Sequence, residues 1–475
     1  MDLKEQAEQI MERASVAAAV FNQYDQAQTD RIVEAVFRVG FDHRVELAQL
    51  AQEETKLGVW QDKVLKNVLA TQFVYQDIKD EKTVGVISHD ERSGITEIAQ
   101  PLGPIFAITP VTNPTSTCLY KILICLKTRN PIIISPHRRS LKCCKRTVEL
   151  CYAAALAADA PEDCIQIVTQ GSRDLSHALM AHPKMALILA TGGTGMVTAA
   201  YSSGTPAIGV GPGNVPVYID RSADIAFAVG SIITSKTFDN GTVCASEQAV
   251  VLEKAIAAEV EREFEKQNCC FLTEEQAAKV EAVAIDKGTG GMSAEVVGQS
   301  AETIAAMAEI TVPAGTKILL VRLTKVGPEA PLSGEVLAPI LAFYVEDTYD
   351  EAVKTCIALN YRGGVGHTAA CHANDEQRIA EFAEAMNAGR VVVNTPSSQG
   401  AVGAFYNTLR AALTLGCGSG GKNSTTENIS AVHLYNVKRI CRPRPDARWL
   451  RMDHAAYLDK NVTGEALWKR YHSNG

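Results

Sequence analysis

Cys244 is the residue of this sequence whose surroundings best suit a nucleophile. It follows the turn-forming residues Asp239, Asn240 and Gly241 and precedes a short run of small and polar residues, 245–248. Asn-Gly turn chemistry places a side chain on a loop rather than on an apolar helix face, and only an accessible thiolate attacks a carbonyl carbon. The alternative is that Cys244 is a small buried hydrophobic residue, as many free cysteines are. The spacing alone leaves both interpretations open.

A glycine-rich segment, Thr191 to Gly195, follows an apolar run at 185–190 and precedes a helix expected to open at Met196. Glycines let a phosphate approach the backbone, and a helix N-terminus favours an anion. The segment is not a GxGxxG motif, and glycine-rich turns between a strand and a helix also occur for steric reasons. It is therefore a candidate nucleotide contact with a structural alternative.

The bulk composition indicates a globular protein of two or three domains. The chain has 475 residues, 46% of them hydrophobic and 21% charged, with a net charge of −8. This charge argues against nucleic-acid binding, and no apolar run is long enough to span a membrane. The charged N-terminus shows no secretory signal. Thirteen cysteines occur without CxxC or Cys/His ligand spacing, which predicts no metal site and a reducing cytoplasmic location.

The elements predicted along the chain give an α/β fold. Residues 1–80 favour helices, and 83–88 and 95–99 favour short strands. Apolar strands are then predicted at 105–108, 131–135, 164–169 and 185–190, each followed by a helix; this alternation is typical of a parallel sheet covered on both faces. Ligands bind at the carboxyl ends of such strands, which directs attention to the loops after Ile108, Ser135 and Ala190.

A second α/β unit is predicted beyond a boundary near residue 240. Strands are expected at 249–252, 317–321, 340–345 and 391–394, and helices at 254–268, 275–310 and 350–359. The segment from 437 onward is rich in basic residues and is expected to be solvated or to contact another subunit.

The motifs and their order resemble those of the CoA-acylating aldehyde dehydrogenases, most closely the aldehyde dehydrogenase half of the bifunctional aldehyde–alcohol dehydrogenases. The resemblance covers roughly residues 8–440. It is carried by the segments Ile108–Ser116 (ITPVTNPTS), Ser135–His137, Ala190–Gly193 (ATGG), Gly209–Asn214 (GVGPGN), Phe238–Gln248 (FDNGTVCASEQ), Gly363–Thr368 (GGVGHT), Asn394–Gly400 and Leu413–Ser419.

The resemblance implies an aldehyde dehydrogenase fold in three parts. These are a Rossmann-like parallel-sheet NAD-binding domain at 1–240 that carries oligomerisation strands near 83–99, an α/β catalytic domain at 241–425, and a C-terminal arm and tail at 426–475. No alcohol dehydrogenase domain follows residue 475 in this sequence and no targeting extension precedes the first helix. We therefore expect a stand-alone cytoplasmic enzyme that forms a homo-oligomer, either a dimer or a tetramer.

The resemblance also assigns roles to individual residues. Cys244 matches the nucleophile, and Asn113 matches the residue whose amide forms the oxyanion hole together with the backbone N–H of Cys244. Glu335 matches the residue that holds the nicotinamide ribose. His137 stands where many non-acylating relatives keep a lysine for the adenosine ribose, so NADP remains an alternative to NAD. The positions expected to line the cofactor are Ile108, Thr109, Pro110, Val111, Thr112, Asn113, His137, Thr191, Gly192, Gly193, Gly211, Glu335 and Leu415.

The implied reaction forms a thioester on Cys244 and transfers the acyl group to CoA. Hydrolytic relatives use a glutamate in a Glu-Leu-Gly-Gly segment to activate water, whereas the matching segment here, Gly211–Asn214, has no carboxylate. Without that base, thiolysis is expected to exceed hydrolysis. His367 is the best remaining candidate to move the proton of CoA, although a lone histidine in a glycine-rich loop is also common as a structural residue.

The substrate remains open at this point. Acetaldehyde or a similar short aldehyde is favoured, with propionaldehyde also in range, and sulfoacetaldehyde or succinate semialdehyde is the alternative. Arg410 and Lys422 add positive charge near the expected pocket and would pair with an anionic aldehyde, but both side chains are equally expected to face water. A hydrolytic dehydrogenase and a non-catalytic protein of the same fold are the more distant alternatives.

Overall fold

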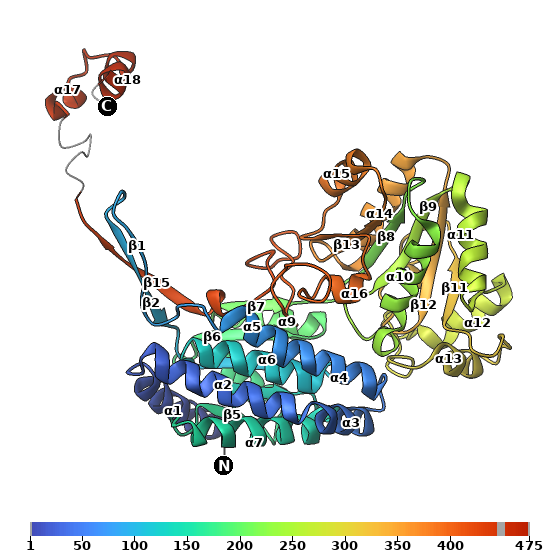
Figure 1. Cartoon of the computed structure of the whole chain (residues 1–475), viewed down its shortest axis with the longest axis horizontal. Helices are drawn as coiled ribbons and strands as arrows, with labels where there is room; N and C mark the ends of the chain where they lie inside the picture. The colour runs from blue at the N-terminus through green and yellow to red at the C-terminus, as the bar shows by residue number, and fades with distance from the viewer. Residues whose placement is uncertain (1, 444–451, 474–475) are drawn as a thin grey trace. The chain divides into compact units, whose positions relative to one another are not determined.

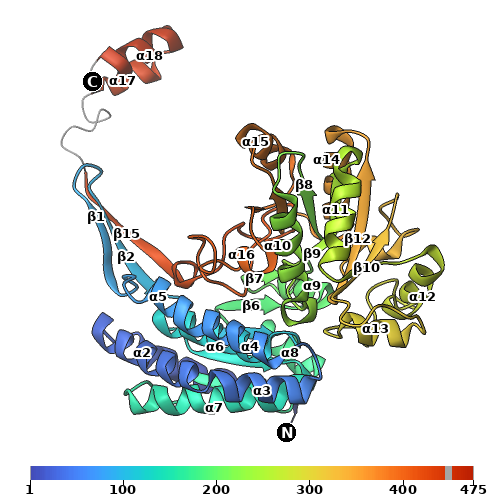
Figure 2. The same ribbon diagram turned by 45° about the vertical axis from the view of Figure 1, so that its right-hand side comes forward.

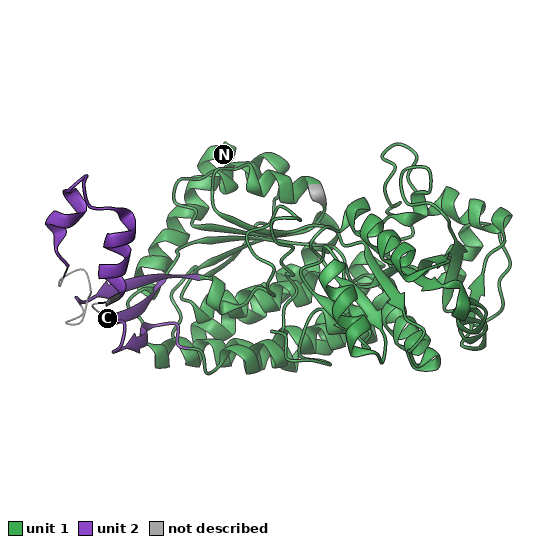
Figure 3. Cartoon of the chain, turned by 90° about the horizontal axis from the view of Figure 1, so that it is seen from above, with its two compact units in different colours: residues 1–81, 101–434 green, residues 82–100, 435–475 purple. Residues whose placement is uncertain are grey.

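The computed structural model describes residues 2–443 and 452–473, which form two compact units. The first contains residues 1–81 and 101–434, and the second contains 82–100 and 435–475 (Figure 3). Residues 444–451 and 474–475 of the tail predicted at 426–475 lie outside the described residues. In the part of the chain that is described, no helix is long and apolar enough to cross a bilayer.

The predicted N-terminal helices are present. In the first two helices apolar residues recur every three or four positions, so each buries one apolar stripe. A capping box between Asp25 and Gln28 starts the second of them. The helices are α1 (Leu3–Phe21), α2 (Gln26–Asp42), α3 (Arg44–Thr55), α4 (Trp60–Val68) and α5 (Val74–Ile78), with a single π-helical turn, Leu69–Phe73, between the last two.

The first sheet has five parallel strands in the order β5-β4-β3-β6-β7, which confirms the predicted strand–helix alternation. The four predicted strands are present, and a fifth, at 207–210, was not predicted because it is only four residues long and ends at a glycine-rich turn. The strands are β3 (Ile105–Thr109), β4 (Ile132–Pro136), β5 (Ile165–Ile167), β6 (Leu187–Thr191) and β7 (Ala207–Val210).

Helices cover both faces of this sheet. One face packs against α6 (Pro114–Lys127) and α7 (Leu141–Ala157), and α2 packs against both of these helices; the three lie side by side in Figures 1 and 2. The other face packs against α1, α8 (Arg173–Met180) and α9 (Thr194–Tyr201). Because both faces are buried, the strands are apolar at nearly every position rather than alternating.

The second sheet has seven parallel strands in the order β10-β11-β12-β9-β8-β13-β14. Its strand β8 (Val215–Ile219) pairs with β9, so the chain passes from one sheet to the other between Val210 and Val215. The predicted boundary near 240 therefore lies too late in the sequence. The other strands are β9 (Glu247–Glu253), β10 (Cys269–Phe271), β11 (Ile318–Arg322), β12 (Ile340–Glu346), β13 (Ala369–His372) and β14 (Val391–Val393).

Helices also cover this second sheet. Helices α10 (Ile225–Thr237) and α11 (Lys254–Lys266) pack on one face, and α14 (Tyr349–Gly363) and α15 (Glu376–Ala385) on the other. The helical region predicted at 275–310 is two helices, α12 (Glu274–Ala284) and α13 (Ala301–Met307). The glycines at 288, 290 and 291 interrupt them. Short α16 (Ser397–Gly400) follows β14.

The second unit contains a three-stranded sheet in the order β1-β2-β15. The two short strands predicted here are present as β1 (Gly85–Asp90) and β2 (Ile95–Pro101), and they pair antiparallel. Strand β15 (Tyr435–Cys441) was not predicted, because its charged side chains hide the alternation. Arg439 pairs with Glu97 of β2 at 2.9 Å. Helices α17 (His454–Leu458) and α18 (Gly464–Ser473) follow in the same unit.

Candidate active site

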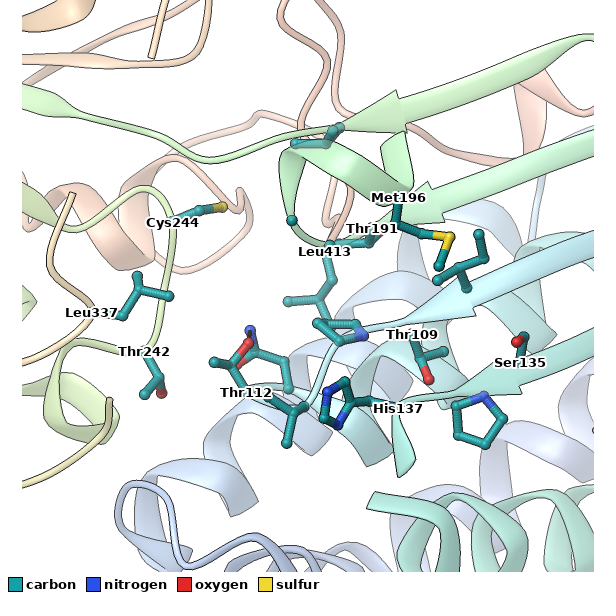
Figure 4. Close-up of a pocket in the computed structure, with 18 of the residues that line it drawn as sticks. Thr109, Thr112, Ser135, His137, Thr191, Met196, Thr242, Cys244, Leu337 and Leu413 are labelled. Atoms are coloured by element: carbon teal, nitrogen blue, oxygen red, sulfur yellow. Dashed lines mark hydrogen bonds between the residues drawn. The ribbon is translucent and has the colours of Figure 1, made fainter. Parts of the chain in front are cut away.

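A cavity of about 1140 Å³ in the first unit collects the predicted site residues. It opens at the carboxyl ends of β3, β4 and β6. In Figure 4, Thr109, Ser135 and His137 line one side, and Thr242, Cys244 and Leu337 line the other. Every residue predicted to contact the cofactor lies on its wall, as do Asn113 and Cys244. His367 is the one predicted site residue that does not line it.

The loop that carries Cys244 is held in an uncommon backbone conformation. Asp239 and Asn240 both adopt left-handed φ values, 50° and 51°, in the short helical turn Phe238–Gly241 that ends α10. Asparagine and aspartate tolerate this region better than most residues do. At Gly241, φ is 76°, and a Cβ would approach the backbone of Ala338 to 3.1 Å. The turn therefore needs its Asp-Asn-Gly sequence to project Cys244 into the cavity.

His367 lies directly behind the nucleophile. Its Nε2 is 3.3 Å from Cys244 Sγ, and its Nδ1 is 2.9 Å from Thr368 Oγ1. The ring is fully buried, and burial together with the charge of Arg390 lowers its pKa to about 3. Burial and, to a lesser degree, Glu335 raise the pKa of the Cys244 thiol to about 12. The resting pair is therefore a neutral thiol beside a neutral imidazole, which is placed to accept the thiol proton.

Gly213 separates the nucleophile loop from His367. A Cβ at this position would lie 2.2 Å from the Cys244 carbonyl oxygen and 3.2 Å from His367 Cγ, so only glycine fits. Its N–H donates to Glu335 Oε1 at 3.0 Å. Burial raises the pKa of Glu335 to about 7. The segment 211–214, which has no carboxylate of its own, thus contacts one from a distant part of the sequence.

Asn113 caps the start of α6 and lines the cavity. Its Nδ2 donates to Thr112 Oγ1 at 3.1 Å, which leaves one amide hydrogen unused. Its Oδ1 accepts a hydrogen bond of 2.6 Å from Lys66 Nζ. The amide therefore turns its nitrogen away from Lys66, as a hydrogen-bond donor for a substrate oxygen requires.

Two groups of residues around the site were not predicted from the sequence. Lys63 and Lys66, one turn apart on α4, both pair with Asp239 in the nucleophile loop. Arg390 lies behind His367. In the sequence, lysines at this spacing look like those of any solvated helix face, and their partner is more than 170 residues away. No local signal distinguishes them.

The fold and this site correspond to a known family. The aldehyde dehydrogenase family matches residues 2–406. The chain belongs to the aldehyde dehydrogenase family. The predicted family and fold are thereby confirmed.

Among curated proteins, this aldehyde dehydrogenase is 43% identical over 462 residues to the bifunctional aldehyde-alcohol dehydrogenase of Escherichia coli (strain K12), a match that covers 96% of this chain and 52% of that protein. The chain thus spans about half the length of that relative. It is also 36% identical over 471 residues to the acylating sulfoacetaldehyde dehydrogenase of Bilophila wadsworthia, covering 97% of this chain and 98% of that protein.

Solved structures agree with the fold. An acetylating aldehyde dehydrogenase from Geobacillus thermoglucosidasius is 43% identical, with a TM-score of 0.90 over 93% of this chain and 98% of that one. A propionaldehyde dehydrogenase from Rhodopseudomonas palustris, solved with bound CoA and an acylated cysteine, is 26% identical. Its TM-score is 0.83 over 92% of this chain and 97% of that chain.

The cavity of this aldehyde dehydrogenase fits a dinucleotide. Helix α9 presents its N-terminus beside Gly192 and Gly193, and a helix N-terminus is a favourable place for a phosphate group. A Cβ at either glycine, or at Gly211, would meet no atom within 4 Å, so backbone and ligand can approach closely. Buried Lys121 fixes the neighbouring strand ends by donating to Ile108 O at 2.7 Å and Leu189 O at 2.8 Å.

The wall near His137 is basic. Arg138 and Arg173 line the cavity beside His137, and both are exposed at the ends of β4 and β5. Glu335 is the single acidic residue among the described residues that line the cavity. The carboxylate that holds an adenosine ribose in many NAD-specific sites is therefore absent from this wall.

Arg410 and Lys422 do not line the cavity. Arg410 pairs with Glu81, and Lys422 is exposed. The cavity wall instead includes many apolar side chains, among them Leu69, Phe238, Leu337, Val402, Phe405 and Leu413. Among the described residues, no group of three or more His, Cys, Asp or Glu side chains is arranged to hold a metal ion.

Proposed function

We propose that this protein is a CoA-acylating aldehyde dehydrogenase that oxidises a short, uncharged aldehyde to its CoA thioester, and catalyses the reverse reaction. The observation that carries the proposal is the 3.3 Å contact between Cys244 Sγ and His367 Nε2 behind a cavity that also receives Asn113. A thiol beside a base that can accept its proton, facing an amide donor, matches the requirements of covalent acyl chemistry.

In the first half-reaction, His367 accepts the Cys244 proton and the thiolate adds to the aldehyde carbon. The new C–S bond forms as the carbonyl π pair moves to oxygen, and Asn113 with the backbone N–H of Cys244 stabilises this oxyanion. NAD, when bound, supplies the acceptor for the hydride that leaves this carbon. The carbonyl then re-forms as a thioester on Cys244. One oxyanion donor typically contributes about 2.7–4 kcal/mol.

In the second half-reaction, the acyl group passes to the CoA thiol. The CoA thiol gives up its proton to water, its sulfur bonds to the thioester carbon, the C–S bond to Cys244 breaks, and the Cys244 sulfur leaves as a thiolate. His367 returns its proton to this sulfur, since His367 Nε2 and Cys244 Sγ are in contact. Because His367 is fully buried, it acts through Cys244 rather than by touching CoA.

In this proposal thiolysis is faster than hydrolysis, because segment 211–214 contains no carboxylate that could activate water. Glu335 is the carboxylate nearest to that segment, and its Oε1 is engaged by Gly213 N. We assign Glu335 to the nicotinamide ribose rather than to a water molecule.

The apolar wall supports a short neutral aldehyde. An unpaired sulfonate or carboxylate buried there would cost several kcal/mol (roughly 2–7 for a polar group without a partner). The cations that an anionic aldehyde would use, Arg410 and Lys422, point elsewhere. Lys66 does reach the cavity, but its charge is paired with Asp239. Sulfoacetaldehyde remains the second candidate, because a relative of matching length is named for it.

NAD is the proposed oxidant, and the basic wall formed by His137, Arg138 and Arg173 leaves room for NADP. We further propose a cytoplasmic homo-oligomer that assembles through the β1-β2-β15 sheet. In a three-stranded sheet the outer strands leave backbone N–H and C=O groups unpaired, and exposed Val86 and Ile440 add apolar surface.

The deciding experiment is an NADH assay with acetaldehyde, propionaldehyde and sulfoacetaldehyde, each with and without CoA. We expect CoA-dependent NADH production with the neutral aldehydes and none from the Cys244→Ala variant. Full-rate NADH production without CoA would instead indicate a hydrolytic enzyme. A clear preference for sulfoacetaldehyde would overturn the assignment of a neutral substrate.

A further inference from the structure

We propose that Lys66 is a positioning residue of the oxyanion site: it holds the side-chain oxygen of Asn113, so that the amide N–H faces the substrate oxygen. The inference rests on the proposed function, since it assumes that Asn113 binds the oxyanion. It adds a residue of α4 to the active site. In the sequence, α4 lies outside every motif that carries the family resemblance.

The geometry fixes the direction of the amide. An asparagine side chain offers an oxygen on one side and an NH₂ group on the other, and either can face a neighbour. An ammonium group has three donors and no acceptor, so the atom 2.6 Å from Lys66 Nζ must be the oxygen, Oδ1. The NH₂ group then points away, with one hydrogen on Thr112 Oγ1 and the second unused.

Lys66 has no hydrogen left for a ligand. Its three shortest hydrogen bonds go to Asn113 Oδ1 at 2.6 Å, Asp239 Oδ2 at 2.5 Å and Thr242 Oγ1 at 3.1 Å, and Thr242 O lies at 3.4 Å. The side chain is only 3% exposed. It therefore acts on the reaction through Asn113, and through Asp239 and Thr242 it ties that amide to the loop that carries Cys244.

A charged lysine is needed for this arrangement. Asp239 compensates its charge, while Lys63 on the same helix competes for the same carboxylate oxygen, and Asp62 accepts from the backbone N–H of Asp239 at 2.7 Å. These are the charged groups that surround the ammonium. Burial, partly offset by Asp239, lowers the pKa of Lys66 to about 8. A neutral amine could accept as well as donate, and would no longer select one orientation of the amide.

Lys63 supplies a matched control. It lies one turn away on α4, is equally buried and pairs with the same oxygen of Asp239 at 2.9 Å. It also donates to the backbone oxygen of Thr112 at 3.1 Å, but it does not touch the Asn113 side chain. Lys63→Met and Lys66→Met remove comparable ion pairs. We expect Lys66→Met to lower kcat by about 10²-fold or more, as loss of an oxyanion donor does, with little change in KM. Lys63→Met should retain kcat within about fivefold. Equal losses in the two variants would overturn the proposal.

The Asn113→Ala background tests the route of the effect. If Lys66 acts through the amide, Lys66→Met should change kcat by no more than about threefold once the amide is absent. A full, additive loss would mean that Lys66 acts in another way. Lys66→Gln, which keeps a donor for Oδ1 without the charge, should recover part of the loss. Circular dichroism and thermal unfolding of each variant identify any that fail to fold.

The pH dependence of the wild-type protein tests the inference without a variant. Its kcat should fall as pH rises above about 8, when Lys66 loses its proton. Lys66→Arg, which stays charged, should move this limb to higher pH. An alkaline limb that stays at the same pH in Lys66→Arg would overturn the inference. An inactive wild-type protein that also fails to form an acyl-Cys244 adduct from acetyl-CoA, detected by mass spectrometry, would instead overturn the proposed function.

Discussion

The guanidinium of Arg390 donates to the backbone oxygen of His367 at 2.9 Å and approaches Thr368 Oγ1 at 3.3 Å. Its other arm donates to Gly416 O at 2.6 Å and Thr426 O at 2.8 Å. One buried side chain thus holds the segment behind the nucleophile against the C-terminal loops of the first unit. Burial, together with this charge, lowers the pKa of His367, and the charge offsets a small part of the rise that burial causes in the pKa of Cys244.

Arg390→Met should slow the reaction of Cys244 and destabilise the fold. Four acceptors would lose a charged donor, and each buried group left unpaired costs about 1–3 kcal/mol. The Cys244 thiol would lose a nearby cation, so its alkylation by iodoacetamide should require a higher pH. Alkylation rates between pH 6 and 10, compared with those of Arg378→Met on the far side of the second sheet, check this. An unchanged alkylation profile would contradict it.

His367→Asn should lower CoA-dependent turnover by about 10²–10⁴-fold, the usual contribution of a positioned base. Because burial lowers the pKa of His367 to about 3, the wild-type histidine is neutral over the whole working range. We therefore expect no inflection near pH 6.5 in its pH–rate profile. His182→Asn, which changes a largely buried histidine paired with Glu8 outside the cavity lining, is the control. An acidic limb near pH 6.5 that disappears in His367→Asn would refute the neutral assignment.

Glu335→Gln should raise the KM for NAD, and it should not increase the CoA-independent rate of hydrolysis. Its carboxylate has a pKa near 7 and accepts from Gly213 N, so the neutral amide can keep the Gly213 contact through its oxygen. Steady-state kinetics with and without CoA separate the two roles. A selective loss of the CoA-independent rate would show instead that Glu335 activates water.

Arg138→Ala and Arg173→Ala should weaken ligands that carry a phosphate on the adenosine ribose. Both cations line the cavity, and no carboxylate lies beside them among the described lining residues, so a ribose phosphate bound at that wall would meet positive charge only. We expect the KM for NADP or CoA to rise about tenfold per residue, with a smaller change for NAD. Equal changes for NAD and the phosphorylated ligands would exclude a phosphate contact. Dephospho-CoA distinguishes the two phosphates, because only the CoA effect should vanish with it.

His372→Leu should stabilise the protein, chiefly at acidic pH. The imidazole on β13 is 1% exposed, neither ring nitrogen has a hydrogen-bond partner, and burial lowers its pKa to about 4. Between pH 6.5 and 4 the unfolded chain binds the proton and the folded protein does not, so stability falls as pH is lowered through this window. The loss approaches about 3 kcal/mol. Urea unfolding at pH 5 and pH 8 should show a larger gain for His372→Leu at pH 5.

The sequence by itself determined the α/β layout of the fold and pointed to residues that line one cavity. Apolar runs of four to six residues separated by helical periodicity identified the first parallel sheet and most strands of the second, because strands buried on both faces leave an unbroken hydrophobic signal. The turn around Asn240 and the loop ending at Asn113 could be found because turn chemistry and motif are local. Short strands such as β7 and β10, and charged β15, carried too little pattern to be seen.

Only the tertiary structure decided what surrounds the nucleophile. The contacts of Cys244 with His367, of Lys66 with Asn113, and of Glu335 with Gly213 join residues 47 to 123 positions apart. The same holds for the division between the sheets, which strand pairing places before Val215 rather than near 240. It also holds for Arg410, whose charge pairs with Glu81 rather than entering the cavity. A lysine or arginine has the same local pattern whether it meets water or a buried carboxylate, and only the folded chain brings that carboxylate to it.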